Sequence, residues 1–454
     1  MTKRIDRKLW VLIAIGTGSF MSALDGSIVN TLLPILRSAL QSNVAAIEWV
    51  VIVYLLVISG LLLTFGRLGD LRGHKSVYVW GFGIFVASSA LCGAVWSASL
   101  LVVFRGMQAI GGAMLASNAP AIVTGNFPPE QRGRAFGLVA MLTYLGLTVG
   151  PSLGGWLTQA FGWRTVFYIN VPVGALALAL SLFFIPKEAP AEGGQPFDLP
   201  GAAVFLAGLT ALLLGLNKGA EWGWFSPAVL GLLVGALLLL VVFIQIERRS
   251  PTPMLDLSLF RIPMFSTSSL SAVLNYICVY SITFLMPFYL IQGRGLNPAQ
   301  AGLLLTAQPV LMAITAPISG ALSDRFGSRW PGMLGMAVLA GGLLLLSSFS
   351  AETELWLVAA GLAVSGAGTG TFISPNTSAL MGSAPRARQG IASGVLATAR
   401  NFGMVLGIGL AGAIFTTHLA QNTLDALYKG VEVGFLVAAG VAVLGIVILA
   451  VKEK

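Results

Sequence analysis

GRLGDLRGHK at residues 66–75 returns as GALSDRFGSR at residues 320–329, and each copy follows a long apolar segment. The aspartates of the two copies, Asp70 and Asp324, lie 254 positions apart. A weaker pair, RGRAFG at residues 132–137 and QGIASG at residues 389–394, repeats at an offset of 257. Two repeats at almost the same offset indicate that a membrane unit was duplicated, so we expect two related halves.

The composition places the chain in a membrane. Of its 454 residues, 56% are hydrophobic and only 9% are charged, and the mean hydropathy of +0.87 is too high for a water-soluble protein of this size. The net charge of +9 does not indicate a nucleic-acid partner, because the basic residues lie singly or in pairs between apolar runs. We expect a chain embedded in a lipid bilayer, with no nucleic acid among its partners.

Fourteen apolar segments are long enough to span a bilayer. Six precede a polar stretch at residues 186–198, two follow it, and six more complete the chain. The prediction is an all-α integral membrane fold: a six-helix bundle in residues 1–190, an inserted helix pair in 191–250 and a second six-helix bundle in 251–454. The expected spans lie near residues 10–33, 47–68, 77–96, 100–124, 134–160, 164–185, 199–217, 227–246, 264–291, 298–322, 331–350, 354–380, 389–417 and 431–451.

The basic residues also predict the orientation of the chain. If the N-terminus lies in the cytoplasm and the spans alternate, 19 Lys and Arg residues fall on the cytoplasmic side, 5 outside and 2 within helices. Cytoplasmic loops of membrane proteins are enriched in Lys and Arg, so we expect both termini in the cytoplasm. Before the ninth span, PMLDLSLFRIPMF at residues 253–265 alternates apolar and charged residues, which predicts an amphipathic helix on the cytoplasmic surface.

Three ionisable side chains lie deep within the predicted spans: Asp25, Arg105 and Arg400. A charge at this depth costs about 2.5–3.5 kcal/mol on insertion scales, so such residues tend to face a cavity and to serve function. Asp25 and Arg105 both fall in the outer half of the bilayer, where they could meet. We predict that Asp25 carries a proton, with a structural ion pair as the alternative. Arg105 would adjust the proton affinity of Asp25 or, as the alternative, orient its own helix. Arg400 would bind anionic substrate groups or, as the alternative, hold its own helix in place.

Other polar residues at cavity depth would line a mostly apolar pocket suited to bulky amphipathic solutes. Gln108 is the strongest candidate, because it stands one helical turn from Arg105. For each amide, hydrogen bonding between helices is the alternative to ligand contact. The candidates are Asn30, Glu48 at the outer mouth of its helix, Tyr54, Gln108, Asn275, Gln308, Asn376 and Arg400.

The sequence shows no catalytic or metal-binding constellation. His74 and His418 lie near loops on opposite sides, and Cys92 and Cys278 lie singly in apolar runs, where packing is their expected role. A phosphate-binding G-x-x-x-x-G-K-S/T loop is missing as well. We expect neither an enzyme nor an ATP-driven pump, and no metal or cofactor beyond a proton gradient.

Four motifs together resemble those of the major facilitator superfamily, in its fourteen-helix drug:proton antiporter branch of multidrug efflux transporters. They are LDGSIVNTLLP at residues 24–34, the repeated loop motif, RGMQAIGG at residues 105–112 and GLTVGPSLGG at residues 146–155. The resemblance implies two bundles that alternate access to a central cavity. It implies export of lipophilic drugs, with cationic compounds among the candidates, in exchange for protons, and hence a role in antibiotic resistance.

The resemblance also assigns roles to the loop motif, whose aspartate in the family latches the outward-facing state. The gate residues would be Gly66, Asp70, Arg72, Gly73, Asp324 and Arg325. We expect the Asp70 carboxylate to meet the positive N-terminal end of a helix in its own half. His74 stands where the family commonly has arginine, and we expect a solvated loop histidine there, with pH sensing as the alternative.

The motif at residues 146–155 marks antiporters in the family and implies a hinge. Gly146, Gly150 and Gly154 recur every four residues and form a smooth stripe, interrupted by Pro151, which lacks the N–H needed for a regular helix. From the residues alone, a packing groove is the alternative.

Two rival functions stay open. The same fold would serve export of one endogenous solute or lipid, and a receptor that does not transport could also be built on it. Two intact gate motifs and the retained Asp25 speak against the receptor. We expect the chain to work as a monomer in a bacterial inner membrane, with protons and a small-molecule substrate as its partners.

Overall fold

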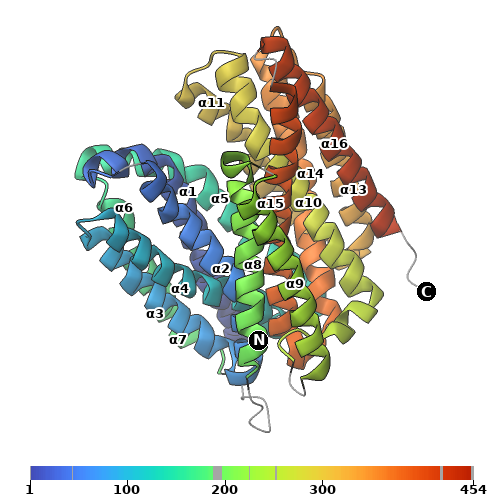
Figure 1. Ribbon diagram of the computed structural model, residues 1–454. Coiled ribbons are helices and arrows are strands. Elements are labelled where there is room, and N and C mark those ends of the chain that lie inside the picture. The colour runs from blue at the N-terminus through green and yellow to red at the C-terminus, as the bar shows by residue number, and fades with distance from the viewer. Residues whose placement is uncertain are drawn as a thin grey trace.

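The computed structural model describes residues 2–42, 44–187, 197–223, 225–250, 253–419 and 423–450. These residues form helices and connecting segments, without a β-strand. Fourteen of the helical segments are long and apolar enough to cross a membrane, and each overlaps one of the predicted spans. The predicted all-α membrane fold is therefore confirmed. Two helical bundles form the body of the molecule, and one further pair of helices lies beside them (Figure 1).

The first bundle is built around aromatic side chains of its third helix. Tyr78, Phe82 and Phe85 are at most 1% exposed, and the Tyr78 hydroxyl donates to the carbonyl of Ile15 at 3.5 Å. Its sixth span consists of a short helix followed by a longer one. The helices are α1 (Thr2–Ala39), α2 (Val44–Arg72), α3 (His74–Ala94), α4 (Ala98–Asn126), α5 (Pro129–Phe161), α6 (Thr165–Tyr168) and α7 (Asn170–Phe184).

The second bundle repeats this plan with a core that includes Tyr289, Phe372 and Phe435. Its elements are α10 (Pro263–Pro287), η2 (Phe288–Gly293), α11 (Pro298–Leu305), α12 (Ala307–Phe326), α13 (Arg329–Ser347), α14 (Leu355–Ser383), η3 (Arg386–Arg388), α15 (Gln389–Leu419) and α16 (Leu424–Ala450). The repeat shows in the backbone, because Gly73 between α2 and α3 has a φ of 87° and Gly327 between α12 and α13 has a φ of 81°. Glycine adopts this left-handed conformation without strain, so both motifs end their helix at the same place.

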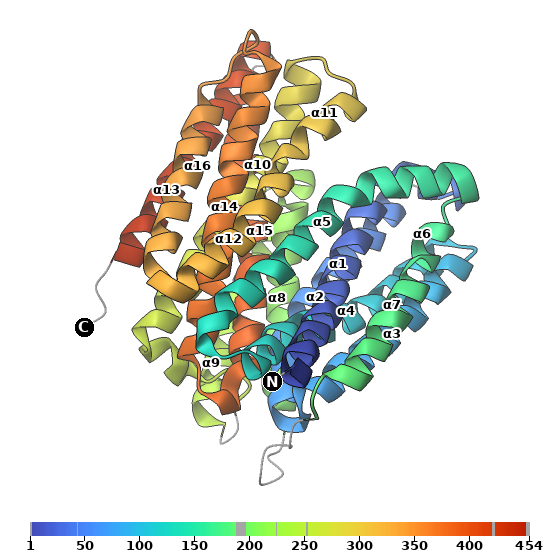
Figure 2. The same ribbon diagram turned by 180° about the vertical axis from the view of Figure 1, so that it is seen from behind.

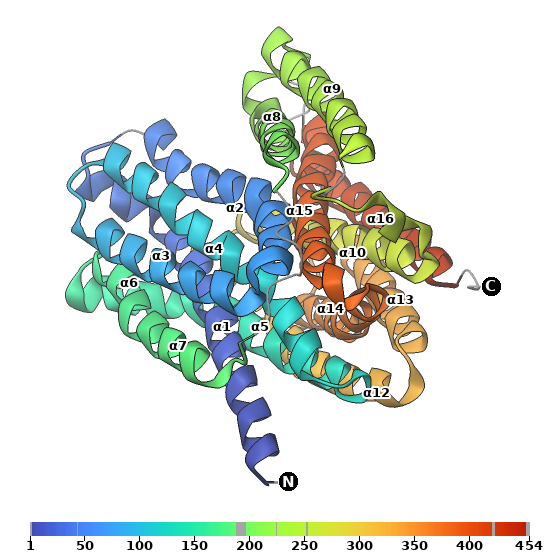
Figure 3. The ribbon, with the colours of Figure 1, turned by 90° about the horizontal axis from the view of Figure 1, so that it is seen from below.

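The inserted pair, α8 (Leu199–Trp222) and α9 (Pro227–Arg249), lies outside the two bundles, and α8 covers the line where α2 meets α15 (Figure 3). Leu213 of α8 is buried in a cluster with Ile52 and Leu56 of α2, and Val405 of α15 packs against it. A single helix thus contacts both halves. The predicted domain boundaries at 190/191 and 250/251 fall on or beside residues 188–196 and 251–252, which lie outside the described residues.

The expected surface helix at residues 253–265 is not formed. In this segment the structure shows one 3₁₀ turn, η1 (Leu257–Arg261), capped by the Asp256 carboxylate, and then the start of α10. Met254 and Leu259 are 0% and 1% exposed, because they are buried in a core cluster that contains residues of both halves. Pro253 and Pro263 interrupt any longer helix, since proline cannot donate the required backbone hydrogen bond. The amphipathic pattern therefore reflects a segment fixed to the protein rather than one lying on a membrane.

The two halves touch along two seams, α2 with α15 and α5 with α12. A methyl group on Gly66 would overlap the backbone of Gly390, and one on Gly133 would overlap the backbone of Gly320. Backbones can approach this closely only where neither residue carries a side chain. Both contacts lie at the end of the molecule that carries Asp70 and Asp324, which we name the latch end. The bundles converge there and diverge toward the opposite end (Figure 2).

Candidate functional site

Asp25 lies at the centre of a buried polar network. Its carboxylate accepts hydrogen bonds from Arg105 Nη1 at 2.6 Å, Gln108 Nε2 at 3.0 Å and Asn170 Nδ2 at 2.8 Å. Gln108 also donates to Ser89 Oγ at 2.6 Å. These five side chains come from α1, α3, α4 and α7, and each is at most 1% exposed. A buried ionised carboxylate needs several donors, so this arrangement is suited to holding a negative charge at Asp25.

The sequence predicted three members of this network and missed two. Asp25 and Arg105 meet, as expected, and Gln108 bonds to both. Asn170 and Ser89 were not predicted. Asn170 is the first residue of α7 and is 145 positions from Asp25, so no local pattern links the two. An amide within an apolar segment was nevertheless the signal that identified Gln108, and it applies equally to Asn170.

Arg105 has partners besides Asp25. Its guanidinium lies over the ring of Tyr54 with 4.2 Å to the ring centroid, donates to Gln108 Oε1 at 2.6 Å and donates through Nε to the Val50 carbonyl at 3.4 Å. Tyr54 and Val50 belong to α2. An arginine stacked on an aromatic ring retains favourable electrostatic contact in a desolvated place. Arg105 therefore connects α1, α4 and α2 at one point.

The glycine stripe of α5 packs against α1, the helix that carries Asp25. A side chain on Gly146 would meet the Phe20 carbonyl, one on Gly150 would meet Ser27, and one on Gly154 would meet Ile28. Pro151 is exposed on another side of α5. The predicted groove thus exists and is filled by α1 within the first half. The sequence did not predict which helix packs into this groove, and the structure shows that it is α1.

At the latch end, the Asp70 carboxylate accepts hydrogen bonds from the backbone N–H groups of Gly390 at 2.7 Å and Ile391 at 3.0 Å. These N–H groups form the first turn of α15. The expectation of a helix in the same half was wrong, because the close approach at Gly66 brings the second bundle next to Asp70. A carboxylate at a helix N-terminus satisfies donors that have no partner within the helix.

Asp324 makes the equivalent contact in the reverse direction. It accepts hydrogen bonds from the backbone N–H of Gly133 at 2.7 Å and of Arg134 at 2.9 Å, at the start of α5. The aspartate of each ten-residue repeat, at residues 66–75 and 320–329, therefore binds the shorter repeat of the other half, at residues 389–394 and 132–137. Arg72 and Arg325, also predicted as gate residues, are exposed, and neither forms a hydrogen bond or ion pair with any residue that the structure describes. The aspartates and the glycines make the contact between the halves.

His74 is buried, at 8% exposure, so the expected solvated loop histidine was wrong. Its Nε2 lies 3.4 Å from the Asp70 carboxylate and its Nδ1 lies 2.9 Å from Asn118 Oδ1. The Asn118 amide donates to the carbonyls of Phe65 and Met114, which directs its oxygen toward the histidine. The ring fills space between α2 and α4 and helps to hold Asp70 in place.

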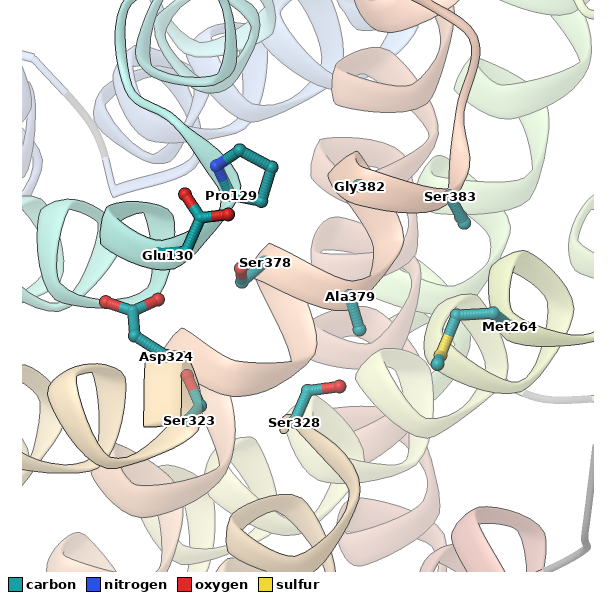
Figure 4. A pocket seen from close by; sticks show the side chains of 10 residues that line it. All are labelled: Pro129, Glu130, Met264, Ser323, Asp324, Ser328, Ser378, Ala379, Gly382 and Ser383. Atoms are coloured by element: carbon teal, nitrogen blue, oxygen red, sulfur yellow. The ribbon is translucent and has the colours of Figure 1, made fainter. Parts of the chain in front are cut away.

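A cavity of about 480 Å³ opens beside Asp324 at the latch end. Figure 4 shows Glu130 and Asp324 on one side of it and Met264 on the opposite side. Hydroxyl groups of Ser323, Ser328 and other serines contribute polar atoms to a lining that also contains apolar surface. None of the residues around Asp25 contributes to this lining, so the cavity gives solvent access to the latch and is separate from the buried network.

The remaining amide candidates make contacts within the second half. Asn275 Nδ2 lies 3.5 Å from Met336 Sδ, and Asn376 donates to the Ser268 carbonyl at 3.0 Å. Gln308 packs against Gly366 through its backbone. Interhelical contact, the alternative reading of these amides, describes Asn275 and Asn376. The side chain of Asn30 lies outside the described part of the structure.

Glu48 and Arg400 lie in different electrostatic surroundings. Glu48 is paired with Lys218 of α8 at 3.4 Å, so its charge joins the inserted pair to α2. Arg400 of α15 forms no ion pair or hydrogen bond with any described residue. Instead, it lies within electrostatic range of four tyrosines.

Known proteins share this architecture along the whole chain. A sequence profile of the Major Facilitator Superfamily matches residues 15–267 and 268–454. The riboflavin transporter RibZ of Clostridioides difficile is 33% identical over 98% of this chain and 97% of its own length. The multidrug resistance protein Stp of Mycobacterium tuberculosis is 33% identical, over 93% of this chain and 79% of its own. The tetracenomycin C resistance and export protein of Streptomyces glaucescens is 31% identical, over 90% and 76%.

Two solved structures share the fold at low sequence identity. The human organic anion transporter MFSD10 superposes with a TM-score of 0.69 at 17% identity, covering 97% of this chain and 99% of that chain. The proton:xylose symporter XylE gives a TM-score of 0.68 at 13% identity, covering 98% and 95%. At these identities the likeness concerns the fold alone.

Proposed function

Because the chain belongs to the major facilitator superfamily, we propose that it is a proton-coupled exporter of lipophilic small molecules in a bacterial inner membrane. The observation that carries this proposal is the buried bond between Asp25 and Arg105 at 2.6 Å. A charged pair deep in a membrane segment is costly, and such groups typically serve proton or substrate pathways. The similarity to Stp and to the tetracenomycin C exporter favours export of drug-like compounds.

The proton would act through the partners of Asp25. When a carboxylate oxygen of Asp25 binds a proton, the negative charge that holds Arg105 disappears. Arg105 keeps the Gln108 oxygen and the Tyr54 ring as partners, so it stays in contact with protein. The link between α1 and α4 is then weakened, and α1 can shift along the glycine stripe of α5. The proton is thereby coupled to a movement of helices.

The two latches would supply the gate that alternating access requires. We place the latch end in the cytoplasm, because this orientation leaves most Lys and Arg residues on the cytoplasmic side. The structure then corresponds to a state that is closed to the cytoplasm, in which Asp25 would receive its proton from outside. Opening the latch end requires that Asp70 and Asp324 release the helix starts that they hold.

A second candidate within transport is the movement of one endogenous solute. RibZ matches this chain over nearly its whole length, and its name states that it transports riboflavin. Riboflavin is therefore the first single compound to test beside drug-like dyes. A receptor without transport is the third reading, and it predicts ligand binding without solute flux.

The test is solute and proton flux in proteoliposomes under an imposed proton gradient, with riboflavin, a cationic dye and a neutral lipophilic dye offered in turn. Asp25→Asn removes the charge, and Glu354→Gln is the matched control because Glu354 is exposed and its side chain caps nothing. Proton movement that depends on solute in the wild type and the control, and is lost in Asp25→Asn, supports the proposal. Coupled flux that persists in Asp25→Asn contradicts the role of Asp25, and solute flux without proton movement contradicts proton coupling itself.

A further inference from the structure

Arg400 lies eleven residues after Gln389, the first residue of α15, or about 16 Å along the helix. Its guanidinium carries a full charge at membrane depth. It forms neither an ion pair nor a hydrogen bond with any described residue of the protein. Such a charge is costly unless water or an anion meets it, and Arg400 is partly exposed, so its guanidinium is open to either.

Four tyrosines from both halves lie within electrostatic range of Arg400. Tyr54 belongs to α2, Tyr144 to α5, and Tyr276 and Tyr280 to α10. Gly403, one turn from Arg400 on α15, packs directly against Tyr276. The four tyrosines thus come from three helices, and Tyr54 and Tyr144 belong to the half opposite to that of Arg400.

The four tyrosine hydroxyls share a further property. Among the described residues, none of them donates or accepts a hydrogen bond, whereas Tyr78, Tyr289 and Tyr428 all use their hydroxyls in this way. Tyrosine hydroxyls within a protein usually find a partner. The four phenol hydroxyls and the guanidinium of Arg400 thus form no hydrogen bond with any described residue. They are therefore available as donors to a ligand.

The net charge of the interior indicates that the ligand is an anion. Asp25 is neutralised by Arg105, and Glu48 at the outer mouth is paired with Lys218. Of the three deep charges, Arg400 alone is left uncompensated, so the interior is positive. This charge would repel a cationic drug and attract an anion.

We propose that Arg400 and these four tyrosines form a binding site for planar aromatic anions, such as aromatic carboxylates or phenolates. The planar guanidinium can bind a carboxylate through two parallel hydrogen bonds. The tyrosine hydroxyls can donate to the same group, and their rings offer flat apolar faces for an aromatic body. This substrate class rests on the proposed export function, and it replaces the expected preference for cations.

Tyr54 connects this site to the proton site. One side of its ring carries Arg105, which holds Asp25, and its hydroxyl lies within range of Arg400. A ligand that binds Arg400 and Tyr54 would therefore also affect the partner of Asp25. Tyr54 thus takes part in both the proton site and the proposed anion site.

The experiment is equilibrium binding to purified protein in lipid nanodiscs, without any gradient, measured by fluorescence anisotropy. The probes are fluorescein and rhodamine 123, which share a xanthene ring system and carry opposite charge. Arg400→Gln removes the charge, and Arg37→Gln is the matched control because Arg37 is exposed at the end of α1. Tyr276→Phe with Tyr280→Phe removes two hydroxyls and keeps the rings, and Tyr168→Phe, 41% exposed, is its control.

We expect the wild type to bind fluorescein more tightly than rhodamine 123. Arg400→Gln should weaken fluorescein binding about 10- to 100-fold, as expected for charge-assisted hydrogen bonds, and leave rhodamine binding equal or stronger. No fluorescein binding to the wild type, tighter binding of rhodamine, or unchanged fluorescein affinity in a folded Arg400→Gln protein would overturn the proposal. Because no gradient is applied, failure of this test differs from failure of proton coupling, which the flux of Asp25→Asn reports.

Discussion

Asp70 in the first half accepts a 2.7 Å hydrogen bond from the backbone N–H of Gly390 in the second half. The equivalent bond between Asp324 and Gly133 has the same length and runs in the opposite direction. The pseudo-symmetry of the chain therefore produces two latches that close the same end. In each latch, one aspartate carboxylate accepts hydrogen bonds from the first backbone N–H groups of a helix in the other half.

Asp70→Asn should favour opening of the latch end. The amide has one acceptor oxygen in place of two and lacks the charge that interacts with the helix dipole, a loss of about 0.5–2 kcal/mol. The measurement is the distance distribution between two spin labels, obtained by double electron–electron resonance. The labels are attached at Arg72→Cys and Ala387→Cys, both at exposed positions. The native Cys92 and Cys278 are buried and should not react with the label. A longer distance should become populated, and an unchanged distribution would contradict the latch.

Gly390→Ala should separate the halves by steric overlap. Its added methyl group would meet the backbone of Gly66, which cannot move without moving α2. We expect the same lengthening of label distances and a transport rate reduced at least several-fold. Gly302→Ala on α11 is the matched control, since nothing lies within 4 Å of the added group. Equal behaviour of the two variants would show that close approach at Gly390 is not required.

The sequence predicted what local patterns encode. Segment lengths and apolarity predicted all fourteen spans, and the cost of burying charge singled out Asp25, Arg105 and Arg400. The partner of Asp70 could not be predicted, because a carboxylate near any helix start satisfies the same rule and only tertiary packing selects α15. Likewise, Asn170 joins Asp25 from 145 positions away, and no spacing rule relates residues on α1 and α7.

The segment at residues 253–265 shows a different limit. Its amphipathic spacing fits a helix lying on a membrane as well as a segment that buries Met254 and Leu259 in a protein core. Its prolines were the local signal against a helix. His74 was misjudged for a similar reason, because its position beside a loop motif gave no sign that α4 covers it.

Gly146→Val should disturb the proton site from a distance. The side chain would meet the carbonyl of Phe20 on α1, a backbone atom that cannot turn away. Displacement of α1 would misplace Asp25 against Arg105, so we expect solute-coupled proton flux to fall at least tenfold. Gly155→Val, on the same helix with open space around it, is the control. If Gly146→Val couples protons as the wild type does, the glycine stripe does not position Asp25.

Asn170→Leu should weaken the Asp25 network without removing its charges. Leucine resembles asparagine in size but cannot donate, so Asp25 retains Arg105 and Gln108 and loses its 2.8 Å bond from α7. Loss of one hydrogen bond to a buried charge costs about 1–3 kcal/mol, which should appear as a lower melting temperature of the purified protein. Gln159→Leu is the control for loss of an amide, because Gln159 is exposed on α5 and forms no hydrogen bond with any described residue. Because Asn170 lies outside every predicted motif, a proton flux that falls in Asn170→Leu and not in Gln159→Leu would establish it as part of the site. Unchanged stability and flux would restrict the site to Asp25, Arg105 and Gln108.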